Sequence, residues 1–138
     1  MADDKPKVKS IHEVVVAVKD AGKAAALYEE LFDLKFDLGW ELPWEKMKVK
    51  AAKIGETQFH FIEPTSPDSV VAKFIENKGE GLNHICFKVS GLSKMIERFR
   101  EKGIKLVPEK PVSFGNISYI FVHPSMTQGV LVELVEEI

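Results

Sequence analysis

The segment IHEVVVAVKD (residues 11–20) decides the fold, because the pattern that it begins occurs twice in the chain. A run of β-branched residues is followed by an acidic residue and then by apolar residues at helical spacing. This pattern predicts a strand over 11–18 and a helix over 22–34 that Asp20 caps. The segment LNHICFKVSGLSKMIERFREKG (82–103) repeats the strand and the helix at similar lengths.

The last strand of each half also has a counterpart in the other half. TQFHFIE (57–63) aligns with VLVELVE (130–136), and the alignment pairs Glu13 with His84 and His60 with Glu133. The separations within the two pairs agree to within two residues, which indicates an internal repeat of one supersecondary unit. We therefore expect an α+β fold in which a single domain (1–138) consists of two modules, over about 10–64 and 81–138.

The other expected elements lie between these repeated segments. Strands are predicted over 47–54 and 117–122 and near 104–107, and a short helix within 66–79, with Pro67 in its first turn and Gly79 as its C-terminal cap. No motif is recognised over 37–53. Its two tryptophans, Trp40 and Trp44, are interpreted as packing or lid residues.

Composition excludes several classes of function. The chain has 138 residues, of which 45% are hydrophobic, and a net charge of −2 with interspersed signs, so neither a basic face for nucleic acid nor a membrane span is expected. The polar start MADDKPKVKS is not expected to be a secretory signal, and a cytoplasmic location is predicted. Because Cys86 is the only cysteine, the chain has neither an internal disulfide nor a cysteine-rich zinc site.

Four strand residues have side chains of the type that binds metals. Glu133 interrupts an apolar strand, where a buried carboxylate is costly unless it has a partner. Strand side chains alternate between faces, so Glu13 and His84 occupy matched positions at the start of their strands, and His60 and Glu133 occupy matched positions on the last strands. Two imidazoles and two carboxylates suit a divalent cation with open positions for water or substrate.

Simpler interpretations exist for each residue taken alone. A carboxylate at the start of a strand is usually solvated, and a lone histidine inside a strand is usually hydrogen-bonded in the core. His12 is the nearest rival to Glu13 as a ligand. A shift of one residue would turn every side chain of that strand to the other face and expose Val14, Val16 and Val18, so Glu13 is preferred.

Three segments resemble those of a known family. GEGLNHICFKV, FVHPSMTQGVLVELVE and SVVAKFIENKGEG are similar to the methylmalonyl-CoA epimerase family, in the vicinal oxygen chelate superfamily that also includes glyoxalase I. The similarity is fairly specific over residues 54–138, moderate over 11–36 and poor over 37–53. It implies paired βαβββ modules in a cupped, mostly antiparallel sheet that holds one divalent metal ion (Co, Zn, Mn or Ni), in a homodimer.

The resemblance also carries ligands over, position by position. The family's histidine and glutamate of the second module fall on His84 and Glu133. In the first module the two ligand types are exchanged: Glu13 stands where the family has histidine, and His60 where it has glutamate or glutamine. The exchange keeps the number and net charge of the donors, so we interpret it as compensation. A catalytic glutamate that some members have on the third strand falls on Val49.

The activity implied by the resemblance is interconversion of (R)- and (S)-methylmalonyl-CoA by proton transfer at C2 through a metal-stabilised enolate. Glu133 is the first candidate base, and Glu13 is the second, in place of the missing glutamate. Lys48 and Lys50 are predicted to bind coenzyme phosphates. The loop that is predicted to hold the substrate carboxylate contains Ser125, Thr127 and Gln128.

Two alternatives remain open at the level of sequence. A glyoxalase I-like isomerase would use the same metal and two carboxylates. A non-catalytic member that sequesters a drug or another small molecule would lack the four metal ligands and would line its cup with aromatic residues, for which Trp40 and Trp44 are candidates.

Overall fold

The computed structural model describes residues 5–138, and residues 1–4, part of the polar start that is not expected to be a signal, lie outside the described residues. The chain divides into two compact units. The first unit comprises residues 13–83, and the second comprises residues 84–138 together with residues 5–12. The expectation of a single domain stays a prediction.

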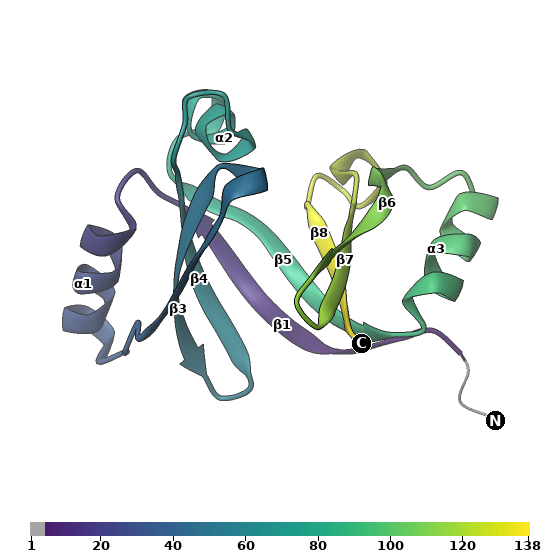
Figure 1. The fold of residues 1–138 in the computed structure, drawn as a ribbon, viewed down its shortest axis with the longest axis horizontal. Coiled ribbons are helices and arrows are strands. Elements are labelled where there is room, and N and C mark those ends of the chain that lie inside the picture. The colour runs from purple at the N-terminus through teal and green to yellow at the C-terminus, as the bar shows by residue number, and fades with distance from the viewer. Residues whose placement is uncertain (1–4) are drawn as a thin grey trace. The chain divides into compact units, whose positions relative to one another are not determined.

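The first unit is a four-stranded sheet with two helices. Its strand order is β2-β3-β4-β1; β4 and β1 are parallel, and the other two ladders are antiparallel. Helix α1 lies beside this sheet, as Figure 1 shows. The elements are β1 (Lys7–Ala17, whose residues 7–12 cluster with the second unit), α1 (Ala21–Phe32), β2 (Leu38–Leu42), η1 (Pro43–Glu45), β3 (Met47–Ile54), β4 (Thr57–Pro64) and α2 (Val70–Lys78).

The second unit repeats this plan with one helix. Its strand order is β5-β8-β7-β6, with β5 and β8 parallel and the remaining ladders antiparallel. The elements are β5 (Gly81–Ser90), α3 (Leu92–Glu101), β6 (Leu106–Phe114), β7 (Ile117–Val122), η2 (Pro124–Met126) and β8 (Val132–Glu137). The predicted α+β class, with a βαβββ order in each half and mostly antiparallel pairing, is confirmed.

The register of the two parallel ladders confirms the internal repeat. Val15 of β1 is the partner of His60 in β4, and Cys86 of β5 is the partner of Glu133 in β8. The first members of these pairs, and likewise the second members, are separated along the chain as the sequence alignment predicted. A repeat that extends to the pairing of individual residues cannot come from a chance similarity of composition.

Each sheet has one face covered by its own first helix. Val18, Ala21 and Phe61 belong to the buried cluster under α1, and their counterparts Val89, Leu92 and Leu134 belong to the cluster under α3. The opposite faces carry separate clusters, and the one in the first unit packs against α2. Buried residues of these opposite-face clusters are Val15, Ala17, Val49, Ala51, Ile62 and Val71 in the first unit, and Cys86, Tyr119 and Val135 in the second.

A carboxylate from the last strand holds the start of the first helix in each unit. Glu63 accepts a hydrogen bond from the backbone N–H of Ala21 at 2.8 Å. Its counterpart Glu136 accepts two, from Gly91 at 2.8 Å and Leu92 at 3.1 Å. Helix α1 has an additional cap, because Asp20 accepts from the N–H of Lys23, whereas Gly91 at φ 70° gives α3 no side-chain cap.

Three expectations need correction. The stretch 37–46, where no element was expected, contains β2, a half-exposed strand whose Gly39 approaches the Val49 carbonyl so closely that an added Cβ would lie 3.3 Å from it. Pro67 precedes α2 instead of lying in its first turn, because Ser69 is the N-cap. The strand expected near 104–107 is β6, which runs to Phe114 as a largely exposed strand. None of the helices over residues 5–138 has the length and apolar character needed to cross a bilayer.

We expect Glu136→Gln to destabilise the protein more than Glu63→Gln. Glutamine keeps one acceptor oxygen, so it can still bond the single N–H that Glu63 caps, but it loses one of the two bonds that Glu136 accepts at a helix with no other cap. The expected losses in the free energy of unfolding are about 1–2 kcal/mol at Glu136 and below about 1 kcal/mol at Glu63. Urea denaturation measures both, with Glu30→Gln on the exposed side of α1 as the control; equal losses would contradict the assignment.

A second prediction concerns Asp68, which precedes α2. Hydrogen bonds from Lys46 and then from Ser66 lower the pKa of Asp68 to about 2. A lowered pKa in the folded state stabilises the fold above the ordinary value of about 3.8, and this contribution disappears as the pH falls through about 2. In Lys46→Met the pKa of Asp68 should rise toward its ordinary value, as measured by NMR titration of the side-chain carboxyl. A pKa that stays near 2 would show that Lys46 is not the main cause.

Candidate metal ligands and comparison with known proteins

The first unit brings together two of the predicted ligands and a third polar residue. The Nδ1 atom of His60 lies 3.6 Å from Oε1 of Glu13, and its Nε2 atom lies 2.8 Å from Oε1 of Gln58. Glu13 and Gln58 are partners in the parallel ladder of β1 and β4, which explains why Glu13 and His60 meet although they lie far apart along the chain. All three lie on the sheet face opposite α1, as strand alternation predicted.

His60 is enclosed by apolar neighbours on that face. Only 4% of its surface is exposed, and its ladder partners Val15 and Ala51 are 1% and 0% exposed. The indole of Trp40 on β2 meets the imidazole edge-on, with ring centroids 5.2 Å apart. Within these apolar surroundings Glu13 and Gln58 provide polar contacts to the two ring nitrogens.

The second unit brings together the other two predicted ligands. The Nε2 atom of His84 lies 2.8 Å from Oε1 of Glu133, and each residue is 8% exposed. The ring of Phe121 meets the His84 imidazole edge-on at 5.1 Å. A carboxylate as buried as Glu133 would be costly without a partner, so the contact with His84 accounts for its place in an apolar strand.

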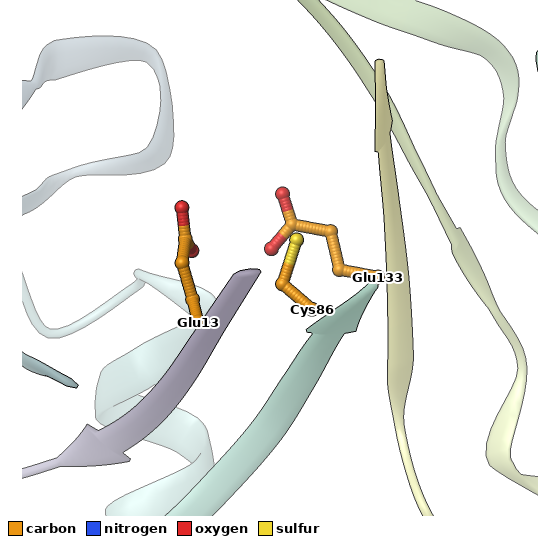
Figure 2. Close-up of side chains that lie close together, drawn as sticks. All are labelled: Glu13, Cys86 and Glu133. Carbon is orange, nitrogen blue, oxygen red and sulfur yellow. The ribbon is translucent and has the colours of Figure 1, made fainter. Parts of the chain in front are cut away.

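A thiol lies beside this second pair. A carboxylate oxygen of Glu133 lies within 4.8 Å of the Cys86 sulfur, as expected from their pairing in the ladder of β5 and β8. Figure 2 shows the Cys86 and Glu133 side chains next to each other, and it also shows the Glu13 carboxylate projecting from β1. Cys86 is fully buried, with its sulfur 4.0 Å from the Phe87 carbonyl.

The rival residue His12 is grouped with the second unit. Burial is the main cause that lowers the pKa of its imidazole, and the positive charge of Lys88 lowers it further. Glu137 and Glu133 act in the opposite direction with smaller effects. Lys88 is itself bound to Glu137, with Nζ and Oε1 2.7 Å apart. The lowered pKa favours the neutral form of the His12 imidazole. The polar residue of β1 that lies next to His60 is Glu13, as preferred from the sequence.

The structure does not bring Lys48 and Lys50 to the face that carries His60. Their ladder partners on β4 are Glu63 and Phe61, both on the α1 side. The Nζ atom of Lys48 lies 3.5 Å from Oε2 of Glu63, the residue that caps α1. A role for these lysines toward coenzyme phosphates stays a prediction, and it would have to be exercised from the α1 side.

The three loop residues predicted to hold the substrate carboxylate follow β7. The Ser125 hydroxyl lies 2.7 Å from Nδ1 of His123, which also accepts the N–H of Ser125 at 3.1 Å. The Thr127 hydroxyl donates to the carbonyl of Val130 at 2.6 Å, and Gln128 has a left-handed backbone at φ 55°. The structure thus groups the three in one turn before β8, while binding of a carboxylate there stays a prediction.

A separate open pocket of about 520 Å³ lies on the α1 side of the first unit. It is bounded by Val16 and Phe61 from the sheet and by Leu27 and Tyr28 from α1. Because these sheet residues point away from the face of His60, the pocket is distinct from the ligand pair.

The sequence did not assign a role to two neighbours of the ligand pairs, Gln58 and Cys86, and it did not predict the position of a third, Trp40. Gln58 and Cys86 lie on the same strand faces as His60 and His84, so the period of two residues was a usable signal for both. The contact of Trp40 with His60 could not be predicted, because no strand was recognised over 38–42.

The chain is similar to known proteins over most of its length. A model of the glyoxalase/bleomycin resistance protein/dioxygenase superfamily matches residues 12–121. The mitochondrial methylmalonyl-CoA epimerase of Bos taurus is 32% identical over 126 residues, covering 90% of this chain and 72% of that protein. The uncharacterized protein YqjC of Bacillus subtilis (strain 168) is 32% identical over 127 residues, covering 91% of each chain.

A solved structure gives the same result for the fold. The crystal structure of methylmalonyl-CoA epimerase from Mycobacterium tuberculosis has a TM-score of 0.87 and 27% identity, and the match covers 95% of this chain and 89% of that one. The resemblance recognised in the sequence and the predicted vicinal oxygen chelate fold are thereby confirmed. The chain belongs to the glyoxalase/bleomycin resistance protein/dioxygenase superfamily, and within it the chain is an isomerase of the methylmalonyl-CoA epimerase type.

Proposed function

We propose that this protein is a metal-dependent epimerase that interconverts (R)- and (S)-methylmalonyl-CoA by proton transfer at C2. The observation that carries the proposal is the pair of matched carboxylate–imidazole contacts, Glu13 with His60 and His84 with Glu133. Each contact joins the first and last strands of its module. Relatives named as methylmalonyl-CoA epimerases support the substrate.

The donor set fits one divalent ion with Glu13, His60, His84 and Glu133 as ligands. Imidazole nitrogen and carboxylate oxygen are the donors that borderline metals such as Zn, Co, Ni and Mn accept. Within each pair the two donor atoms face each other closely, and both histidines and Glu133 are buried. When bound, the ion supplies Lewis-acid stabilisation of the negative charge that develops on the thioester oxygen.

The two carboxylates of the set provide the proton-transfer groups. The hydrogen on C2 of the substrate is acidic because the electron pair that it leaves behind is delocalised into the thioester carbonyl as an enolate. Glu133 takes this proton on one face of C2, and Glu13 supplies a proton on the opposite face, which inverts the centre. Val49 occupies the third-strand position where some relatives have a glutamate, so Glu13 is assigned the second role.

The remaining assignments complete the proposal. Ser125, Thr127 and Gln128 hold the free carboxylate of the substrate, and Lys48 and Lys50 contact the coenzyme phosphates. The protein acts as a homodimer in the cytoplasm. The cytoplasmic location rests on the composition of the chain, the other statements rest on the resemblance to the epimerase family, and each stays a prediction.

The metal content tests the ligand assignment. One ion per chain is expected by elemental analysis if the two pairs share it, since two separate sites would give two. Trp40 provides an optical readout, because Trp44→Phe leaves it as the only tryptophan of the chain, with its indole in contact with His60. Paramagnetic Co²⁺ added to the metal-free Trp44→Phe protein should quench the Trp40 fluorescence in a saturable manner.

The same titration on the double variant Trp44→Phe, His60→Ala is the control. Quenching should be largely lost there, with a fall in affinity of about tenfold or more. Undiminished quenching, or a protein that takes up no divalent ion, would contradict the metal assignment.

The proton-transfer roles are tested by the interconversion of (R)- and (S)-methylmalonyl-CoA, measured beside exchange of the C2 proton in deuterium oxide by NMR. Glu13→Gln should lower the turnover of interconversion by about 100- to 10,000-fold with the metal content retained, because glutamine keeps an oxygen donor but cannot carry the proton, while Glu133 can still exchange the C2 proton from its own face. Glu41→Gln, on an exposed carboxylate of β2, serves as the matched control and should exchange normally.

Two outcomes would overturn parts of this proposal. Full turnover in Glu13→Gln would exclude Glu13 as a base. If the unaltered protein does not exchange the C2 proton but converts thiol–aldehyde adducts, the glyoxalase I-like alternative would take the place of the epimerase.

A further inference from the structure

We propose that Trp40 determines the size of the substituent that C2 of the acyl-CoA substrate can carry. This inference rests on the proposed epimerase function and deepens it. The substrate class is the coenzyme A thioesters of malonic acids with one small alkyl group on C2. Trp40 restricts that group to a methyl, and a smaller side chain at this position admits an ethyl group.

Trp40 has a suitable place in the first unit. It lies on β2 as the ladder partner of Val49, and it shares the buried cluster of Val15, Ala51 and their neighbours on the sheet face opposite α1. Its indole meets the His60 imidazole at a centroid distance of 5.2 Å and an angle of 82°. Because the two rings are neighbours, a substrate held at His60 would lie beside the indole.

The neighbours of His60 differ in what they offer a substrate. The flanks at Glu13 and Gln58 are polar, with oxygen atoms directed at the imidazole, so they offer no apolar contact to the C2 substituent. Val15 and Ala51 are sealed in the sheet at 1% and 0% exposure. Trp40 is a partly exposed apolar neighbour of the imidazole, so it offers an apolar contact that a substrate can reach.

The shape of the indole makes this contact selective. An indole has only two rotatable side-chain bonds, and Trp40 packs against the buried cluster of this face with Leu38 and Leu42 on the same strand face, which limits how far its ring can move aside. A pocket that is full with a methyl group discriminates against one additional methylene by about 10- to 200-fold. Truncation of the indole removes the steric barrier without changing any of the four proposed ligands.

The experiment compares kcat/KM for methylmalonyl-CoA and ethylmalonyl-CoA in the unaltered protein, Trp40→Phe, Trp40→Ala and Trp44→Ala. The preference for the methyl compound should fall at least tenfold in Trp40→Ala and by a smaller factor in Trp40→Phe. Trp44, half-exposed in η1, is the matched control: Trp44→Ala should keep the preference of the unaltered protein. Thermal unfolding of each variant checks that it is folded. If Trp40→Ala does not fold, the test uses Trp40→Phe alone.

The outcomes separate this inference from the proposed function. An unchanged preference in folded Trp40 variants that still exchange the C2 proton would overturn the role of Trp40 and leave the epimerase standing. A change of the same size in Trp44→Ala would also overturn it. Absence of C2 exchange with either compound in the unaltered protein would overturn both proposals.

Discussion

Parallel pairing of the first and last strands within each module is the constraint on which the candidate ligands depend. The ladder of β1 and β4 joins two segments that are distant along the chain, and the ladder of β5 and β8 does the same in the second unit. In both, residues at equivalent registers are brought together, which turns single polar side chains in distant strands into carboxylate–imidazole pairs. A shift of one residue in either ladder would direct one member of the pair to the opposite face.

The two pairs are equivalent in chemistry but opposite in direction. In the first unit the carboxylate comes from the first strand and the imidazole from the last, and in the second unit the order is reversed. Because either arrangement places one acceptor and one imidazole across the same ladder, an exchange of the two residue types leaves the charge and the donors of a pair unchanged. This equivalence explains how the two units can hold the same kind of pair with the residue types in opposite order.

The sequence predicted the repeated strand and helix pattern and helix α2, and it missed strand β2. The near-constant separation between matched residues predicted that Glu13 and His84, and likewise His60 and Glu133, occupy equivalent positions in the two halves, and the two parallel ladders confirm this. Strand β2 was missed because it is short and half-exposed and contains a glycine and a proline-terminated end, so it lacks a clear pattern. The sequence also did not show that Lys48 and Lys50 lie on the sheet face opposite His60, because this depends on the pairing of β3 with β4. The contact of Lys48 with the cap residue Glu63 is a tertiary feature that a single strand pattern does not contain.

The helix caps Glu63 and Glu136 have a consequence for the dynamics of the sheets. Each cap lies three residues after a candidate ligand on the same strand, His60 in one case and Glu133 in the other, and points to the opposite side. Opening of α1 or α3 at its first turn would therefore release the strand segment that holds the ligand. Native-state hydrogen exchange would then report each first helix and the last strand of its module as one cooperative opening unit, although two other strands lie between them along the chain.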